Sequence, residues 1–354
     1  MEKTAWPLPG ESALLPGGEA DVALIKNLGR YVCMVSAGHQ GRGLGWWRVV
    51  ILQPKHIYAL ILVTLIWGLT FPAMKIGSLY LPPLSFAAWR FFLGALCLLP
   101  LAGRRQGKLW HAGRDFWPLF LLGLLQTAIM GGTLHLGISM VKSGITSVVL
   151  YSYPFFFTFL AFLLLREPLK GKQMAGLITG FAGLILVVDP WKMHPTHAEL
   201  TGILVLLGGS ISWGLASVYL KAAFKTRDKL VVTTYQMFYG SLVLMLVAAF
   251  ADHGLRFSWT APGLGIMLYT ALLTSALGFV ILLTIQARYP ASQTSVYLFL
   301  VPVFGVLSSS LLLGEKLTLN LLLGLALVAA GIITVNLGAP ARAREKTDWV
   351  APGK

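Results

Sequence analysis

The chain has 354 residues, of which 56% are hydrophobic and 12% are charged, and its mean hydropathy is +0.74. Soluble domains carry charge on about a quarter of their residues, so this composition excludes an ordinary soluble protein and indicates an integral membrane protein. The net charge of +15 does not indicate a nucleic-acid partner, because the basic residues lie in short segments between apolar runs. The two cysteines, Cys33 and Cys97, provide no disulfide or metal framework.

Residues 1–54 carry scattered glycine, proline and charge without a sustained apolar period. We interpret this segment as a disordered tail or as a misassigned start, with translation beginning near Val49 or Leu52. No signal peptide is recognisable at Met1, so the first apolar run is expected to serve as the insertion signal.

The rest of the chain is dominated by apolar runs that are long enough to cross a membrane, for which about 20 residues are needed. We predict that each run is a helix, because a backbone in lipid must satisfy its own hydrogen bonds and the runs lack the alternation of barrel strands. The ten predicted spans cover residues 57–74, 82–102, 116–138, 145–165, 173–188, 200–220, 231–251, 264–285, 293–313 and 318–337.

The distribution of lysine and arginine predicts how the spans are oriented. Basic residues gather after the second, fourth, sixth and tenth spans, whereas the opposite loops hold about one each. Loops rich in lysine and arginine stay on the cytoplasmic side. We therefore expect both termini to be cytoplasmic, with residues 338–354 as a cytoplasmic tail.

The sequence contains an internal duplication. With a constant offset of 148 residues, Pro154 aligns with Pro302 and Glu167 with Glu315, and with an offset of 146 residues Trp67 aligns with Trp213. The duplicated halves cover residues 57–188 and 200–337, with five predicted spans each. Because five is odd, the second half must enter the membrane upside down. Inverted repeats of this kind are typical of secondary transporters.

These features carry a resemblance to a known family. The ten spans, the Trp-Gly pairs of the first and sixth spans, and a proline followed thirteen residues later by glutamate in each half resemble the drug/metabolite transporter superfamily, EamA type. The resemblance covers residues 57–337. It implies an inner-membrane carrier, commonly an exporter of amino acids or other small metabolites, with a central cavity between the halves and the fifth and tenth spans at the periphery.

Two residues inside the predicted spans could carry chemistry. Arg90 lies about 12 Å from the outer end of the second span, at about 1.5 Å per residue. A cation at that depth is usually functional or paired, so Arg90 could bind the carboxylate of an amino acid or organic acid; the alternative is that it bonds helix-end carbonyls or reaches outward to the interface. His135 of the third span could carry a proton near neutral pH, or it could simply pack against a neighbouring helix.

The remaining candidates are aromatic and small polar side chains that suit a small amphipathic ligand. Four of them sit deep in spans that the resemblance places around the cavity, and the two repeat-related tryptophans join them. Core packing is the alternative for each. These candidates are Gln126, Tyr151, Ser275, Tyr297, Trp67 and Trp213.

We therefore predict an all-α membrane transporter that moves a small organic solute by rocking its two halves, without enzymatic activity and without a cofactor. No phosphate-binding loop of the G-x4-G-K-[ST] type is present. An integral-membrane enzyme would need clustered His, Asp or Cys residues at a membrane face. A scaffold subunit without transport activity stays an alternative. The expected partners are a small-molecule substrate and the lipid bilayer, with a homodimer left open.

Overall fold

The computed structural model describes residues 53–106, 115–166, 171–188, 196–257, 260–286, 297–298 and 300–338. Two terminal segments of the sequence interpretation, the tail up to residue 52 and the tail after residue 338, lie outside these residues. The first helix begins at Pro54 and the last ends at Gly338, so both extend slightly beyond the predicted limits of 57 and 337.

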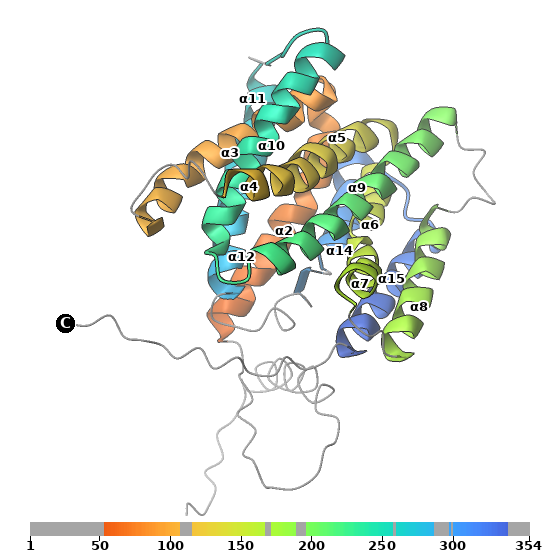
Figure 1. Ribbon diagram of the computed structural model, residues 1–354. Helices are drawn as coiled ribbons and strands as arrows, with labels where there is room; N and C mark the ends of the chain where they lie inside the picture. Colours follow the sequence, from red (N-terminus) through yellow and green to blue (C-terminus); the bar gives the residue numbers. More distant parts are fainter. Residues whose placement is uncertain are drawn as a thin grey trace, which may run out of the picture. The chain divides into compact units, whose positions relative to one another are not determined.

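Every regular element among the described residues is helical (Figure 1). Two of the elements, η1 and η2, are π-helical turns that continue directly from the α-helix before them into the one after them. The elements are α2 (Pro54–Gly77), α3 (Pro83–Gln106), α4 (Phe116–Gly123), η1 (Leu124–Ile129), α5 (Met130–Met140), α6 (Ser143–Leu150), α7 (Tyr153–Leu165), α8 (Gly171–Val188), α9 (His197–Ala223), α10 (Lys229–Ala251), α11 (Ala261–Leu268), η2 (Tyr269–Leu277), α12 (Gly278–Gln286), α14 (Leu300–Leu313) and α15 (Leu319–Gly338).

Seven continuous helical stretches among the described residues are long and apolar enough to cross a membrane. They correspond to the first, second, third, fourth, sixth, seventh and eighth predicted spans. Three shorter apolar helices, α8, α14 and α15, occupy the positions of the fifth, ninth and tenth. Large apolar side chains such as Leu246 and Leu311 are exposed on the outside of the bundle, as expected for a surface that faces lipid.

The fourth predicted span is interrupted by a short turn between α6 and α7, just before Pro154. Pro154 lies in the first turn of α7, where a missing backbone N–H costs little. The carbonyl of Leu150 accepts a hydrogen bond from the hydroxyl of Ser210 (2.9 Å), and the carbonyl of Val149 accepts one from Ser152 (2.6 Å). Serine hydroxyls therefore satisfy the carbonyls at the break.

Glycines at repeat-related positions make equivalent close contacts in the two halves. Gly68 of α2 lies against Phe304 of α14, and Gly214 of α9 lies against Phe156 of α7. Gly214 is the repeat mate of Gly68, and Phe156 is the repeat mate of Phe304. Both contacts therefore join one half to the other, each through a glycine of one half and a phenylalanine of the other.

The most extensive helix pair joins α8 and α15, which lie side by side at one edge of the bundle in Figure 1. A methyl group added to Gly183 would come within 2.7 Å of the backbone nitrogen of Val328, and one added to Gly331 within 2.6 Å of the backbone nitrogen of Gly180. The backbones are therefore in direct contact, which is the packing that small residues allow between membrane helices.

Candidate functional site around Arg90

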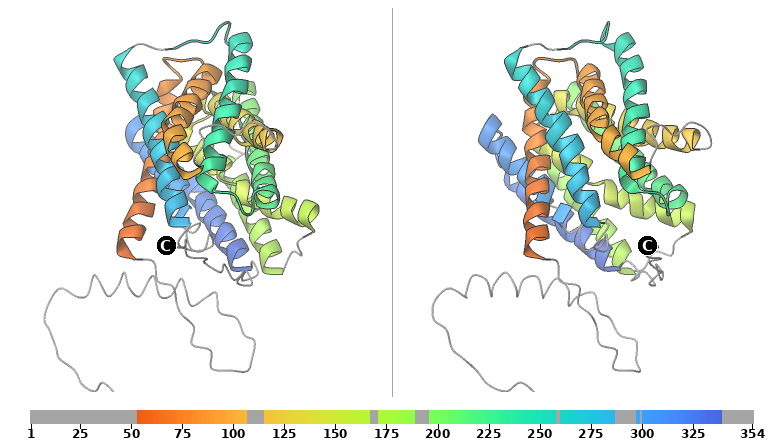
Figure 2. Two further views of the ribbon diagram at one scale, coloured as in Figure 1. Left: turned by 60° about the vertical axis from the view of Figure 1, so that its left-hand side comes forward. Right: turned by 90° about the vertical axis from the view of Figure 1, so that its left-hand side faces the viewer.

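The two π-helical turns occupy equivalent positions in the two halves: an offset of 148 places the ends of η1, Leu124 and Ile129, on Leu272 and Leu277 of η2. The helices α2, α3 and the one that contains η2 run side by side in both views of Figure 2. A methyl group on Gly94 of α3 would lie 2.9 Å from the Cβ atom of Ser275 in η2, so α3 approaches η2 closely. Single π turns inside α-helices occur frequently at functional sites.

Each π turn presents a hydroxyl to a buried polar side chain of a neighbouring helix. The Nε of Arg90 on α3 donates a hydrogen bond to the Oγ of Ser275 (3.1 Å). In the other half, the Oγ1 of Thr127 on η1 donates one to the Oε1 of Gln236 on α10 (2.8 Å). Gln236 is the repeat mate of Arg90 and Thr127 that of Ser275, so the same contact is built twice, once with a charge and once without.

Arg90 is a buried cation with only 6% of its surface exposed. Its NH1 nitrogen lies 3.0 Å from the sulfur of Met74, and its guanidinium lies 5.0 Å from the centre of the Phe91 ring. A guanidinium carries five N–H donors, and one reaches a hydroxyl and one a weak sulfur acceptor. No carboxylate of the described residues pairs with it. The remaining N–H donors have no carboxylate partner within the described ranges.

His135 shares the Phe91 ring with Arg90. The imidazole packs edge-on against Phe91 (ring centres 6.3 Å apart) and Phe86 (5.0 Å), and its Nδ1 lies 2.8 Å from the carbonyl of Gly131. Because that carbonyl can only accept, Nδ1 carries the proton, and Nε2 has a free lone pair. Nε2 is buried and has no hydrogen-bond partner among the described residues. An unsatisfied buried acceptor is unusual and calls for an explanation.

One face of α2 connects the predicted site residues. Trp67, Phe71 and Met74 follow the helical spacing of four and three residues. The Nε1 of Trp67 donates a hydrogen bond to the carbonyl of Thr274 (3.1 Å), directly before Ser275, while Met74 touches Arg90. Phe71 packs against Tyr151 with ring centres 6.2 Å apart.

Tyr151 begins an aromatic cluster that lies beside this face. Its ring is 5.5 Å from that of Trp213, which stacks on Tyr153 with ring centres 3.9 Å apart and planes inclined by 12°. The Tyr151 hydroxyl has no hydrogen-bond partner in the part of the chain that the structure describes. Tyr153 and Trp213 keep partial exposure. The cluster therefore offers aromatic faces and one free hydroxyl.

The structure brings most, but not all, of the predicted residues together. Arg90 is bonded to Ser275, Trp67 lies beside Ser275, and Tyr151 contacts Trp213. Gln126 lies on η1 and is half-buried, without a described contact to this group. Tyr297 is half-buried in the short described segment 297–298, and its place in the site stays a prediction.

Sequence reasoning missed Met74, Thr127 and the π turns. The signal for Thr127 was present, because the offset of 148 maps it onto Ser275, which the sequence had singled out. Met74 gave no signal, since its sulfur becomes a polar contact only through the position of Arg90. Among the described residues no group of three His, Cys, Asp or Glu side chains could hold a metal ion.

Comparisons with known proteins place the chain among transporters. The EamA-like transporter family matches residues 54–189 and 200–337. The chain belongs to this family. The uncharacterized transporter YvbV of Bacillus subtilis is 31% identical over 292 residues, covering 82% of this chain and 94% of that protein. A probable amino-acid metabolite efflux pump of Escherichia coli is 27% identical over 289 residues, covering 77% of this chain and 91% of the relative.

A solved crystal structure has the same fold, with a TM-score of 0.56 at 15% identity, and the match covers 78% of this chain and 96% of the other. Together with the apolar helices, the family membership makes this protein a multi-pass membrane transporter. The names of the family and its relatives indicate transporters rather than enzymes.

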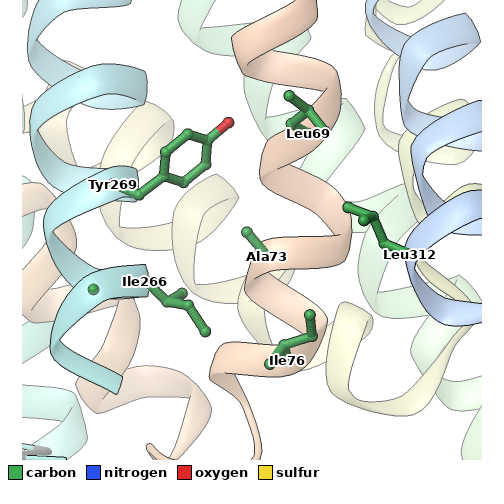
Figure 3. Close-up of a pocket in the computed structure, with 7 residues that line it drawn as sticks. Leu69, Ala73, Ile76, Ile266, Tyr269 and Leu312 are labelled. Atoms are coloured by element: carbon green, nitrogen blue, oxygen red, sulfur yellow. The ribbon is translucent and has the colours of Figure 1, made fainter. Parts of the chain in front are cut away.

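An apolar groove of about 290 Å³ lies along α2 of this EamA-like protein, on a different face from that of Trp67, Phe71 and Met74 (Figure 3). Its lining includes Leu69, Ala73 and Ile76 of α2, Ile266 and Tyr269 on the opposite side, and no charged side chain. Leu312, which also lines it, is 59% exposed. The groove therefore faces the surroundings of the bundle, and it does not include the polar contacts around Arg90.

Proposed function

We propose that this protein is a secondary carrier of the inner membrane whose ten spans form two inverted five-span halves. The halves alternately open a central site to either side of the membrane, and both termini are cytoplasmic. Support comes from the paired family matches, from the repeat-related contacts of the π turns, and from the two repeat-related glycine–phenylalanine contacts between the halves.

The substrate class that the site suits best is a small organic solute with a carboxylate group, such as an amino acid. The single observation that carries this proposal is Arg90, a buried guanidinium with free donors and no carboxylate partner among the described residues. Arginine donors match carboxylate oxygens two by two. The relatives named as probable amino-acid metabolite efflux pumps support amino acids and export as the first case to test.

The aromatic cluster supplies the second part of the proposed site. Tyr151 carries a free hydroxyl that can bond a polar group of the solute, and the faces of Tyr153 and Trp213 can cover its apolar part or attract an ammonium group. A solute with a carboxylate at one end and an ammonium or apolar group at the other suits both parts.

Transport is expected to be driven by a solute or ion gradient or by exchange of solutes, because the sequence contains no phosphate-binding loop for ATP. His135 is the candidate proton carrier, since its Nε2 is a free acceptor beside the Phe91 ring that Arg90 also contacts. A scaffold without transport activity is the competing reading, and it requires no ligand at Arg90.

Ligand binding to the purified full chain tests the proposal without assuming a direction. A ligand that binds only the folded state raises the unfolding temperature. We expect stabilisation by some members of a panel of free amino acids and small organic acids, and loss of the effect with the matching amides or methyl esters, which lack the carboxylate. Equal stabilisation by acids and esters would contradict the role given to Arg90, and no stabilisation by any compound would favour the scaffold.

A further inference from the structure

A carboxylate of the second half holds a helix of the first half at one end of the bundle. Glu315, between α14 and α15, accepts hydrogen bonds from the backbone N–H of Ser143 (2.8 Å) and of Gly144 (3.0 Å), and the Ser143 hydroxyl lies 2.9 Å away. Glu315 therefore caps the first turn of α6, where an anion is favoured by the helix dipole.

A second contact at the same end repeats this chemistry. Asp252, directly after α10 in the second half, accepts hydrogen bonds at its Oδ2 from the backbone N–H and the hydroxyl of Ser85, both 2.7 Å long. Ser85 lies in the first turn of α3 in the first half. In both cases one carboxylate binds the N–H and the O–H of a serine that is fully buried.

Lys75 reinforces the first of these contacts. Its Nζ donates to the carbonyls of Ile138 (2.8 Å), Ser139 (3.1 Å) and Val141 (2.9 Å) at the end of α5. The turn between α5 and α6 is thus bracketed by a cation at the end of one helix and by Glu315 at the start of the next. This end of the bundle, where α2 and α5 finish, is the outer end in the proposed orientation.

The described contacts between the halves at the opposite end are of a different kind. Arg105 pairs with Asp228 (3.0 Å) and Arg227 with Asp115 (2.8 Å), and the four side chains are between 24% and 51% exposed. Exposed ion pairs are screened by water and salt and contribute little. They resist separation of the halves less than the buried serine contacts do.

At the opposite end the repeat keeps the carboxylate of Glu315, as Glu167, but not the serines of these contacts. The mates of Ser143 and Ser85 are Ala291 and Val231, which lack a hydroxyl, and the mate of Asp252 is Gln106, which lacks a negative charge. Ala291 lies outside the described residues, so this comparison rests on its identity alone. Two otherwise equivalent ends therefore differ in the groups that can hold them closed.

We propose that the Glu315–Ser143 and Asp252–Ser85 contacts latch the outer end, so that the resting carrier is closed to the outside and takes up its solute from the cytoplasmic side. The inference rests on the orientation and the alternating access of the proposed function. A conformational equilibrium shifts by the difference between the interactions made in its two states, and these contacts exist only while the outer end is closed.

Labelling of a buried cysteine tests the latch without any substrate. The full chain would carry Cys33→Ser and Cys97→Ser, with Ser147→Cys as the reporter. Ser147 is fully buried one turn below Ser143 and packs against Gly305 of α14. A membrane-impermeant maleimide is applied from outside to intact cells and, separately, to inside-out vesicles, and the labelling rate is followed.

We expect Ser143→Ala and Asp252→Asn each to raise the labelling rate from outside by about fivefold or more, as the closed state loses population. Glu199→Gln is the matched control, because Glu199 also caps a helix at this end but does so through Thr196 of its own half. Thermal unfolding of every variant reports loss of fold separately from opening.

An unchanged rate in both latch variants, or an equal increase in Glu199→Gln, would overturn the latch. An increase seen only from the cytoplasmic face would overturn the closed outer end together with the proposed orientation. Because no solute is involved, failure of the transport proposal would leave these readouts intact, so the two failures are distinguishable.

Discussion

Replacing Arg90 by glutamine is the most informative single change in the proposed solute site. Glutamine is the residue at the equivalent position of the second half, Gln236, where it is buried and bonded to a hydroxyl of a π turn. The fold therefore accommodates an amide in this environment. Arg90→Gln removes the charge while it retains a group that can bond Ser275.

The expected loss follows from the donors that Arg90 leaves free. If the guanidinium binds a carboxylate through two parallel charge-assisted hydrogen bonds, its removal eliminates both bonds. Hydrogen bonds to charged groups contribute about 1.5–3 kcal/mol each. Because an amide keeps part of the interaction, a net loss of about 3 kcal/mol is reasonable, which is roughly 150-fold in affinity. We expect KM to rise by one to two orders of magnitude or more, with a smaller change in the maximal rate.

Counterflow of labelled amino acids in liposomes measures both quantities. Arg105→Gln serves as the matched control, since it makes the same substitution at an arginine that is 44% exposed and pairs with Asp228 on the surface. We expect the KM of this control to stay within about twofold of the unmodified protein. A similarly small change for Arg90→Gln, in a protein that transports, would refute the assignment of Arg90 as the anion contact.

Two further predictions concern packing and proton coupling. Gly331→Ala should lower the stability of the fold by about 1–3 kcal/mol, because the new methyl group meets the backbone of Gly180 at 2.6 Å. Gly208→Ala, whose methyl group would have no neighbour within 4 Å, should be neutral or stabilising by up to about 1 kcal/mol. Thermal unfolding in detergent compares the two variants, and equal losses of stability would contradict the close α8–α15 contact. His135→Phe should change stability little, since the loss of the Nδ1 hydrogen bond to Gly131 offsets the removal of the buried Nε2 without a partner. It should abolish any stimulation of transport by a pH gradient. Stimulation that survives would make His135 a packing residue.

The repeat was readable from the sequence because identical residue types recur at a constant spacing. A spacing of 146 residues mapped Trp67 on Trp213 and placed Arg90 opposite Gln236, and a spacing of 148 mapped Glu167 on Glu315. The break beside Pro154 was also predictable, because proline removes a backbone hydrogen bond wherever it occurs. Arg90 and Ser275 were both singled out by their chemistry, and the structure joins them.

The partners of these residues were not readable, because they depend on how helices from different halves approach one another. No local pattern marks a π turn, which here coincides with the close contact of Gly94 with η2. The groups that donate hydrogen bonds to Glu315 lie 171 and 172 residues away in the chain, and no local sequence pattern indicates them. Gln126 was singled out by its depth in a span, and its role stays a prediction.

The central claim, that this EamA-like protein carries carboxylate-bearing solutes, is tested most directly by reconstitution. Liposomes that contain the full chain are loaded with unlabelled amino acids. The entry of labelled amino acids is then compared with their entry into protein-free liposomes. We predict saturable accumulation of the labelled amino acids, which unlabelled free acids inhibit and their methyl esters do not. Entry no faster than in protein-free liposomes, or competition by esters as strong as by acids, would contradict it.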